Sequence, residues 1–300
     1  MRYALSMALL RTTSLGKSYG NIVALDNLNF IVESGQVMGL LGPNGSGKST
    51  TLGILLGVTK GYRGEYRWFN QDNHHKLRQR VGAILEEPIF YPYLSGANNL
   101  KIAAKIKRVA KQDIGRVLEL VGLADRASSA FKTYSLGMKQ RLAFASALLG
   151  KPEVLVLDEP TNGLDPQGIA DIRDLIIRLA EDGITIILAS HLLDEVEKVC
   201  THVSVLKKGK LLSSGAVNEV IQGNDELHLK CKEPNKLLSA VSNMPELQNP
   251  TLKGETVIVT VDADYNEEAL NKQLMEQDLI LIGLQRIPKR LEDQFLELTK

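Results

Sequence analysis

The stretch GLLGPNGSGKSTTL, residues 39–52, contains residues whose types and spacing suit the binding of phosphate groups. Four residues separate Gly42 from Gly47, and Lys48 and Ser49 follow directly, which completes the G-x-x-x-x-G-K-S template of a phosphate-binding loop. Because glycine tolerates unusual backbone dihedrals, the N–H groups of such a loop can converge on phosphate oxygens, and a following helix N-terminus adds partial positive charge. The stretch therefore favours a site for a nucleoside triphosphate over a plain glycine-rich turn.

Lysine and hydroxyl side chains give this loop its expected chemistry. We expect Lys48 to reach the β- and γ-phosphates, Ser49 to give its hydroxyl to Mg²⁺, and Thr50 to lie near the phosphates. The residues predicted to bind the nucleotide here are Gly42, Pro43, Asn44, Gly45, Ser46, Gly47, Lys48, Ser49 and Thr50.

Two acids end the apolar run VLVLDEP, residues 154–160. An apolar strand that ends in an acid can supply the second magnesium partner of a triphosphate site. We expect Asp158 to hold Mg²⁺, directly or through water, and Glu159 to polarise a water for attack on the γ-phosphate. The alternative is that both acids lie in a solvated loop after a strand, and the phosphate-binding loop favours the catalytic interpretation.

Alternating strands and helices are predicted through the first two thirds of the chain, which is typical of a parallel sheet covered by helices. Val37 to Leu41 has the pattern of a buried strand, and apolar residues at helical spacing follow Lys48. VLVLDEP and ITIILASH are apolar runs suited to central strands, and QGIADIRDLIIRLAED between them has the pattern of a crossover helix. Strand, loop and helix therefore follow in the order that the loop requires.

The alternation of strands and helices that is typical of a parallel sheet ends at about Gly223. DELHLKC, TVIVTVD and LILIGLQ are strand-like, and the helical patterns NKLLSAVSNM and NEEALNKQLMEQ separate them. This alternation predicts a small α+β appendage.

Composition excludes some classes of partner. The chain has 300 residues, a net charge of +1 and 24% charged residues, so no strong field favours nucleic acid or an anionic membrane surface. Cys200 and Cys231 form no metal motif and suit a reducing compartment, so we expect inert thiols. The start MRYALSMALL has no convincing cleavage site, and no stretch reaches the roughly 18 apolar residues of a spanning helix. Any membrane role would therefore come through a partner.

Further segments resemble the nucleotide-binding subunit of an ABC transporter. YSLGMKQRL aligns with the signature loop of that family through Ser135 and Gly137, whereas Leu136 and Met138 depart from its usual glycine and glutamine. An amphipathic run follows, as expected of the helix behind the loop. Ser135 could also serve as the N-cap of that helix.

Three more positions are assigned by this resemblance. TNGLDP is similar to the D-loop, with Asp165 at its acidic position, and ASH places His191 where the family has its switch histidine, near the γ-phosphate. LGKSYGNIVAL places Tyr19 where the family carries an aromatic that stacks on adenine. A lone histidine is otherwise more often structural, and a lone tyrosine more often packs in a core or on a surface.

The resemblance implies a fold and a domain plan. We expect an α/β P-loop NTPase core, with a RecA-like parallel sheet, an antiparallel β-subdomain and a helical subdomain near residues 86–150, within an ATPase domain at residues 1–223. Residues 224–300 would form the small α+β accessory domain. ATP and Mg²⁺ are the implied ligands.

The resemblance also implies partners. In the family two such domains pair head to tail, so that the phosphate loop of one and the signature serine of the other close over each ATP. The second copy could be identical or not. Separate transmembrane permease subunits would hold the protein at the inner, cytoplasmic face of the cell membrane, and no nucleic acid partner is expected.

An acidic residue in place of a glutamine indicates one subgroup of the family. VGAILEEPIFYPYLSGANNL has Glu86 where the family normally has a glutamine that reaches Mg²⁺ and the attacking water, and Glu87 leaves the assignment ambiguous. With this acid, the chain is similar to exporters associated with bacitracin and lantibiotic resistance, although Glu86 could merely replace glutamine in a generic transporter subunit. Tyr91, Pro92, Tyr93 and the helix near Asn98 to Lys105 lie where the family receives a short helix of its membrane partner, and they could equally pack within the helical subdomain.

Two other classes of protein remain. A soluble ABC-type ATPase that remodels ribosomes or DNA typically carries two cassettes or a long coiled coil, and the chain has one cassette and no sustained heptads. A kinase or GTPase with the same loop would leave the signature and D-loop segments unexplained. The leading hypothesis is therefore an ATP-hydrolysing subunit that exports a peptide or drug-like compound through separate membrane subunits.

Overall fold

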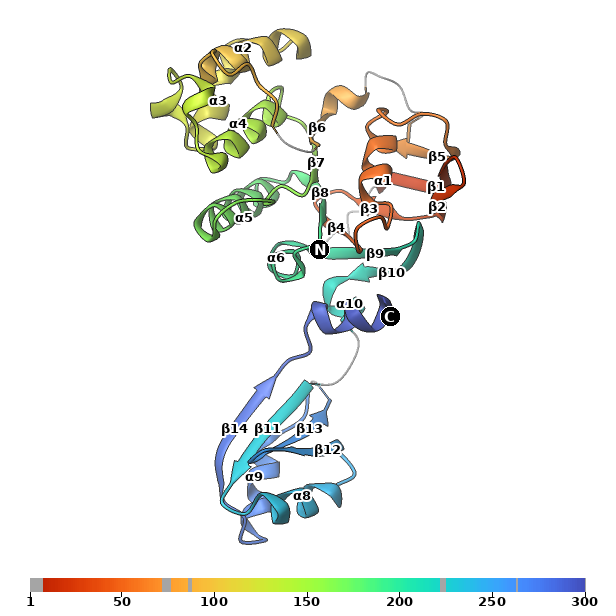
Figure 1. Ribbon diagram of the computed structural model, residues 1–300, viewed down its shortest axis with the longest axis vertical. Coiled ribbons are helices and arrows are strands. Elements are labelled where there is room, and N and C mark those ends of the chain that lie inside the picture. The colour runs from red at the N-terminus through yellow and green to blue at the C-terminus, as the bar shows by residue number, and fades with distance from the viewer. Residues whose placement is uncertain (1–7, 72–76, 86–87, 222–224, 263, 300) are drawn as a thin grey trace, which may run out of the picture. The chain divides into compact units, whose positions relative to one another are not determined.

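The computed structural model describes residues 8–71, 77–85, 88–221, 225–262 and 264–299 (Figure 1). The chain divides into two compact units, of which the first ends at Val217 and the second covers Asn218–Leu298. Each unit has its own sheet structure and its own cluster of buried apolar residues.

A six-stranded, mostly parallel sheet lies at the centre of the first unit, in the order β10-β9-β4-β8-β7-β6. Only β10 runs antiparallel to its neighbour. The strands are β4 (Val37–Leu41), β6 (Val81–Ile84), β7 (Val154–Asp158), β8 (Thr185–Ser190), β9 (His202–Lys207) and β10 (Lys210–Ala216). Every residue of β4, β7 and β8 is buried, as expected of parallel strands that are covered on both faces.

A second, antiparallel sheet surrounds the long strand β1 (Ala8–Tyr19). β1 pairs with all three other strands, which are β2 (Ile22–Leu28), β3 (Ile31–Glu33) and β5 (Arg63–Trp68). Figure 1 shows helix α1 (Lys48–Leu55) beside this sheet.

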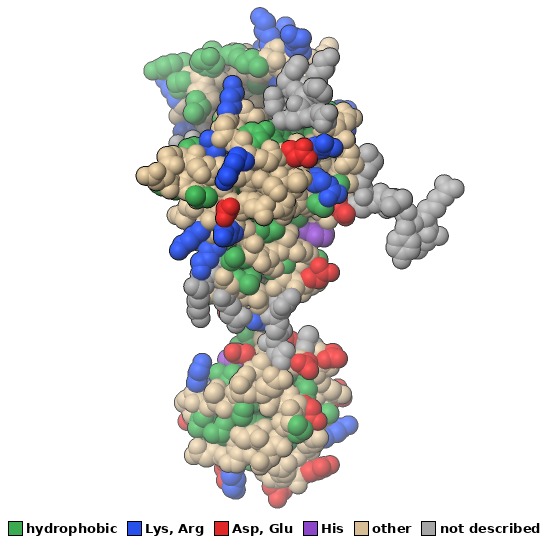
Figure 2. Space-filling view, turned by 90° about the vertical axis from the view of Figure 1, so that its right-hand side faces the viewer, with side chains coloured by type: hydrophobic (Ala, Val, Ile, Leu, Met, Phe, Trp, Pro, Cys, Tyr) green, Lys and Arg blue, Asp and Glu red, His purple; other side chains and the backbone are tan. Residues whose placement is uncertain are grey.

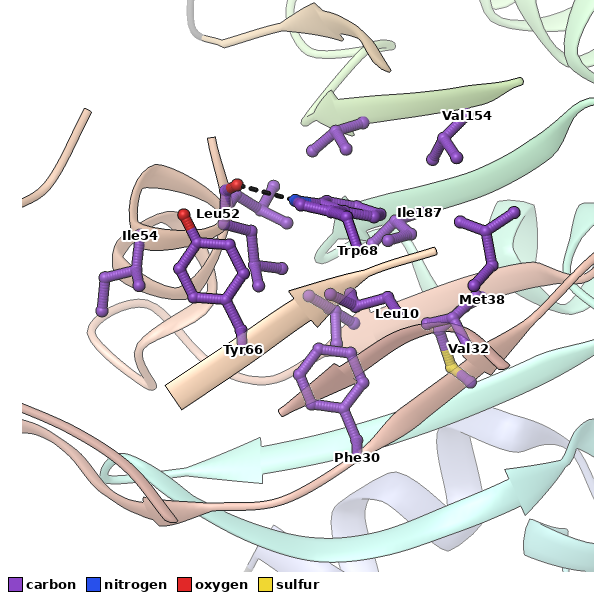
Figure 3. Packing of buried hydrophobic residues seen from close by; sticks show 14 of the residues in the cluster. Leu10, Phe30, Val32, Met38, Leu52, Ile54, Tyr66, Trp68, Val154 and Ile187 are labelled. Carbon is purple, nitrogen blue, oxygen red and sulfur yellow. Dashed lines mark hydrogen bonds between the residues drawn. The ribbon is translucent and has the colours of Figure 1, made fainter. Parts of the chain in front are cut away.

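One core joins the two sheets through α1. Leu52, Ile54 and Leu55 of α1 belong to the same buried cluster as Leu10 of β1 and residues of β7 and β8. Trp68 is fully buried there, and its indole N–H donates a hydrogen bond of 3.0 Å to the carbonyl of Leu55 (Figure 3). A buried indole needs such a partner, so this bond fixes the end of β5 to the end of α1.

The remaining helices of the first unit form two groups. Figure 1 shows α2 (Gly96–Lys107), α3 (Asp113–Leu120) and α4 (Leu136–Leu148) together, apart from α1. α5 (Pro166–Glu181) connects β7 to β8, and α6 (Leu193–Val199) packs against β4. Short 3₁₀ helices are η1 (Leu77–Arg80), η2 (Ala124–Arg126) and η3 (Phe131–Thr133), and α7 (Val217–Val220) follows β10.

The second unit has the β-α-β-β-α-β element order. Its antiparallel sheet has the order β12-β13-β11-β14, which is the split arrangement of two interleaved βαβ halves. The elements are β11 (Asp225–Cys231), α8 (Pro234–Ser242), β12 (Gln248–Lys253), β13 (Thr256–Val261), α9 (Glu267–Met275), β14 (Leu281–Ile287) and α10 (Leu291–Thr299). The three strands and two helices predicted after Gly223 are thereby confirmed.

Cys200 is a buried thiol whose reactivity can be predicted. Burial raises its pKa from 9.0 to about 12. The thiolate is the reactive form, so at pH 8 this shift lowers its population by roughly three orders of magnitude. In a Cys231→Ser variant we expect Cys200 to react with a disulfide reagent far more slowly in the native protein than in denaturant. Native labelling at a rate close to the denatured rate would contradict the predicted inert thiol.

Candidate functional site

The predicted catalytic residues follow three neighbouring strands of the central sheet. Leu41 of β4 pairs with Ser190 of β8, and Asp158 of β7 pairs with Ala189 of β8. The strands are parallel, so the phosphate-binding loop, the acids at the end of β7 and His191 all emerge at the carboxyl edge of the sheet. This edge is where open α/β sheets bind their ligands.

The loop between β4 and α1 depends on glycine at three positions. Gly45 and Gly47 have φ angles of +77° and +108°, in the left-handed region that favours glycine. A Cβ atom at Gly42 would lie 2.3 Å from Ser46 Oγ, and one at Gly47 would lie 2.6 Å from the Ala24 carbonyl oxygen. Side chains are therefore excluded by close neighbours at Gly42 and Gly47 and disfavoured by the backbone conformation at Gly45.

The polar groups of the loop are placed for an anion. Gly47 is the N-cap of α1 and no side chain of the described residues caps this helix, so its first N–H groups face the loop. Ser46 Oγ is buried and has no hydrogen-bond partner among the described residues. These features fit a bound phosphate group.

Lys48 is buried at the first position of α1. Its Nζ donates a hydrogen bond of 2.7 Å to the carbonyl of Gly42 and lies 4.0 Å from Glu159 Oε1. The Gly42 carbonyl thus holds the Lys48 ammonium group across the loop, close to Glu159 at the end of β7. This is the position from which a lysine could contact phosphate groups.

Glu159 lies in a strained backbone conformation directly after β7. Its φ angle is +46°, which is uncommon for a residue other than glycine, and its N–H donates to the carbonyl of Ala189. Such strain is found most often at functional sites. Here it sets the carboxylate between two other predicted residues.

His191 contacts Glu159 through its side chain and its backbone. The distance between His191 Nδ1 and Glu159 Oε2 is 2.8 Å, and the His191 N–H donates to the same oxygen at 3.3 Å. The structure therefore brings Lys48, Glu159 and His191 together, although they lie far apart in the sequence. A carboxylate held by a histidine beside a phosphate-binding loop can orient a water molecule for attack on phosphorus.

Oxygen donors suited to magnesium are present at the same edge. Asp158 is buried at the end of β7, Ser49 is exposed in the first turn of α1, and α1 packs against β7. A carboxylate and a hydroxyl are the hard ligands that Mg²⁺ prefers, so this donor set fits the ion. Glu86, the third predicted ligand, and Glu87 lie outside the described residues.

The other predicted site residues lie on separate elements and have contacts of their own. Ser135 caps α4 by accepting a hydrogen bond of 3.3 Å from Met138 N–H, and Gly137 lies in the first turn. Asp165 caps α5, with Oδ1 2.9 Å from Gly168 N. Tyr19 ends β1, is half exposed, and has Lys17 Nζ 4.8 Å from its ring centroid. Across the described ranges, no hydrogen bond or ion pair connects Tyr19, Ser135 or Asp165 with Lys48.

Asn99 has a role that the sequence analysis missed. It is buried in α2, and its side chain accepts from Tyr91 N–H at 2.9 Å and donates to the carbonyls of Tyr91, Leu94 and Ser95. The segment 91–95 is therefore fixed by one amide. The only signal in the sequence is an asparagine at a position that helical spacing would bury.

None of the helices in the described parts of the chain is long and apolar enough to cross a membrane.

The chain is similar to a known protein family and to several individual proteins. The family profile described as ABC transporter matches residues 25–162. An uncharacterised ABC transporter ATP-binding protein of Bacillus subtilis, YhcH, is 39% identical over 97% of this chain and 96% of its own length. The bacitracin transport ATP-binding protein BcrA of Bacillus licheniformis is 37% identical over 97% of both chains.

A shorter relative and a solved structure each match about two thirds of the chain. The lantibiotic transport ATP-binding protein SrtF of Streptococcus pyogenes is 38% identical over 68% of this chain and 89% of its own length. The dimeric structure of the ATP-binding cassette MJ0796 in a post-hydrolysis state, bound to ADP and Pi, has a TM-score of 0.61 and 26% identity, and it covers 69% of this chain and 98% of that one.

Proposed function

The chain belongs to the ABC transporter family as an ATP-binding subunit, and we propose that it powers the export of a peptide antibiotic or drug-like compound through separate membrane subunits. The predicted family, α/β fold and ATPase activity are confirmed by this membership. ATP-binding subunits of this family dimerise and work with membrane permease subunits. The contacts among Lys48, Glu159 and His191 carry the catalytic part of the proposal.

Each predicted residue at the carboxyl edge of the central sheet has a proposed role in ATP hydrolysis. The N–H groups of the loop and Lys48 bind the phosphates of ATP, while Glu159 takes a proton from the attacking water and His191 holds the Glu159 carboxylate and the γ-phosphate in place. Mg²⁺, when bound by Ser49 and Asp158, would neutralise charge on the phosphates. Glu86 is proposed to orient the magnesium shell, and Tyr19 to stack on adenine.

A second subunit is proposed to complete the site. Ser135 caps α4 and Gly137 lies in its first turn, so both stand at a helix N-terminus that carries partial positive charge. We propose that this N-terminus contacts the ATP held by the loop of the partner, with Asp165 at the same interface. The nucleotide then acts as the contact between subunits, and its hydrolysis lets them part.

An aromatic surface of the first unit is the proposed contact with the membrane subunits. Tyr91 and Tyr93 are 61% and 80% exposed on the segment 91–95 that Asn99 fixes, and Ile89, two residues before it, is 92% exposed. Figure 2 shows hydrophobic side chains at the top of the first unit, the end at which Figure 1 shows α2. Exposed aromatics on a rigid backbone are typical of protein interfaces. This arrangement supports docking of a partner at the inner face of the membrane.

The cargo is inferred from the relatives. BcrA is named for bacitracin transport, and its similarity extends over almost the whole of both chains, including the second unit. Cargo is selected in membrane subunits, so the class of compound is proposed by this likeness and not by any residue of this chain.

Drug susceptibility tests the proposal. The chain would be expressed, together with the membrane subunits encoded by neighbouring genes, in a bacterium that is sensitive to bacitracin and lantibiotics. We expect the minimum inhibitory concentration of one of these compounds to rise, and to return to the host value with Glu159→Gln. An ATPase-active complex that changes neither susceptibility would contradict export of this class. Copurification with ribosomes or DNA, without membrane subunits, would favour the remodelling alternative.

A further inference from the structure

Positive charge is concentrated in one part of the first unit. Residues 88–150 contain ten lysines and arginines but three acids, a net charge of +7, whereas the whole chain has a net charge of +1. The near-neutral total gave no reason to expect an anionic membrane surface as a partner, but it hides this asymmetry. A local excess of positive charge indicates that this part, which contains α2, α3 and α4, meets a negatively charged partner.

Helix α2 carries a basic stripe, which consists of Lys101, Lys105 and Arg108. Lys101 and Lys105 are exposed and stand one helical turn apart, and the exposed Arg108 is the C-cap of the helix. Lys101 Nζ donates a hydrogen bond of 3.0 Å to the neutral side chain of Asn98. Within the described ranges, no acid forms an ion pair with any residue of the stripe. Its three charges are therefore open to an external anion.

The charged groups nearest to the stripe along the chain are turned to contacts within the unit. Residues 88–112 contain no aspartate or glutamate. The carboxylate of Asp113, which follows, accepts from Arg116 Nε with Oδ1 and from Gly150 N–H at 2.8 Å with Oδ2. Lys107, the remaining basic residue of α2, is half-buried and donates to two carbonyls near the end of α4. The exposed face of α2 therefore keeps its net positive charge.

Isoleucines lie beside the basic stripe. Ile102 and Ile106 directly follow Lys101 and Lys105, so they too stand one turn apart, and Ile106 is 77% exposed while Ile102 is half-buried. Figure 2 shows hydrophobic side chains next to lysines and arginines at the end of the first unit where Figure 1 shows α2. Basic and exposed apolar side chains together on one helix are typical of helices that lie at a membrane surface.

We propose that the exposed face of α2 binds the anionic headgroups of phospholipids, with Ile106 in contact with the apolar side of the interface. The sign of the charge favours lipid over the membrane subunits, because the cytoplasmic loops of membrane proteins carry an excess of Lys and Arg, whereas the lipids of the cytoplasmic leaflet are anionic. Nucleic acid would pair with the lysines but would give the exposed isoleucine no apolar contact. The inference rests on the proposed function for one point, the location at the inner face of the membrane.

Asn99 connects this face to the aromatic surface that is proposed to contact the membrane subunits. It lies on α2, and its side chain holds the segment 91–95 through the backbone of Tyr91, Leu94 and Ser95. Lipid bound at α2 would therefore hold Tyr91 and Tyr93 at the membrane before a membrane subunit is engaged. This goes beyond the proposed function, in which only those subunits bring the chain to the membrane.

Binding of the full chain to lipid vesicles tests this contact. We expect vesicles of three parts phosphatidylcholine and one part phosphatidylglycerol to sediment with the chain, and less so as salt rises, because salt screens exposed charges. Lys101→Gln with Lys105→Gln is expected to weaken binding by about tenfold or more, since each basic residue near an anionic surface adds to the affinity. Lys253→Gln with Lys272→Gln removes the same charge from exposed positions of the second unit and should bind like the wild type.

Several outcomes of this experiment would overturn the proposal. They are a wild-type chain that ignores the anionic vesicles or binds vesicles of phosphatidylcholine alone equally well, and a Lys101→Gln, Lys105→Gln variant that binds like the wild type. Equal losses in the two double variants would show an effect of net charge alone and would also overturn it. Tighter binding to a short DNA duplex than to the anionic vesicles would assign the stripe to nucleic acid instead.

A fluorescent label at position 106 gives a second measurement. In a Cys231→Ser background, a polarity-sensitive dye on Ile106→Cys is expected to shift its emission to the blue when vesicles with phosphatidylglycerol are added. The same dye on Glu181→Cys, at the exposed end of α5, should not respond. Vesicle binding without a shift at position 106 would mean that another surface meets the lipid, and the proposal would be wrong.

The lipid contact and the proposed export can fail separately. A chain that binds anionic vesicles through α2 but confers no drug resistance with its membrane subunits would contradict export and support the lipid contact. A chain that confers resistance but does not bind these vesicles would support export and overturn the lipid contact.

Discussion

Glu159→Gln is expected to lower the kcat of ATP hydrolysis by about 10²- to 10⁴-fold, the usual contribution of a general base. Glutamine keeps the shape of the side chain and can accept a hydrogen bond from the His191 N–H, as Glu159 Oε2 does at 3.3 Å. It cannot take a proton from water. The loss should therefore appear in kcat, while the affinity for ATP stays close to that of the wild type.

The same variant should trap the ATP-bound dimer. If the nucleotide forms the contact between subunits, a protein that binds ATP without splitting it remains closed, and gel filtration with Mg-ATP should show a dimer that the wild type loses on turnover. Glu181→Gln, at the exposed end of α5, is a matched control and should hydrolyse ATP normally. Wild-type turnover in Glu159→Gln would remove Glu159 as the base, and a monomer with bound ATP would contradict the clamp.

The sequence predicted those parts of the site whose structure is decided by residues close together in the chain. The strand Val37–Leu41 and the helix that begins at Lys48 agree with the sequence prediction, because glycine conformation, apolar runs and helical spacing act within a few residues. Ser135 and Asp165 are helix N-caps, and a polar residue before a helical pattern is a local signal of the same kind.

The contacts of Glu159 could not be predicted in this way. They depend on the strand order β4-β8-β7, which places the ends of β7 and β8 side by side, and the chain order of the strands does not specify which will be neighbours. The positive φ of Glu159, whose N–H donates to the carbonyl of Ala189 in β8, has no local signal in the sequence either. Family resemblance assigned His191 near the phosphates, but only the sheet shows that it holds Glu159.

Two elements of the second unit were missed for physical reasons. β12 reads QNPTLK, which is polar and contains proline, so it has no strand-like pattern and forms only as the edge partner of β13. α10 (Leu291–Thr299) was not predicted, although its apolar residues recur at helical spacing. β14 was predicted as a strand, but its position at an edge of the sheet follows from the sheet order alone.

Lys48→Ala is expected to weaken ATP binding by about 10- to 150-fold, because each hydrogen bond to a charged group contributes about 1.5–3 kcal/mol. The side chain is buried, its Nζ is held by the Gly42 carbonyl at 2.7 Å, and phosphate oxygens would replace that carbonyl as partners. Alanine is favourable in a helix, so α1 should still form and the loss can be assigned to the missing ammonium group.

Equilibrium titration with ATP measures this effect, and the choice of variants separates charge from geometry. Lys48→Arg keeps the charge but replaces a compact ammonium with a planar fork that cannot follow the same path beside Gly42, so we expect it to recover little of the affinity. Lys111→Ala, an exposed lysine between α2 and α3, removes one positive charge elsewhere on the unit and should bind ATP like the wild type. If Lys111→Ala and Lys48→Ala lowered affinity equally, the lysine would act only through net charge, and the phosphate contact assigned to Lys48 would be wrong.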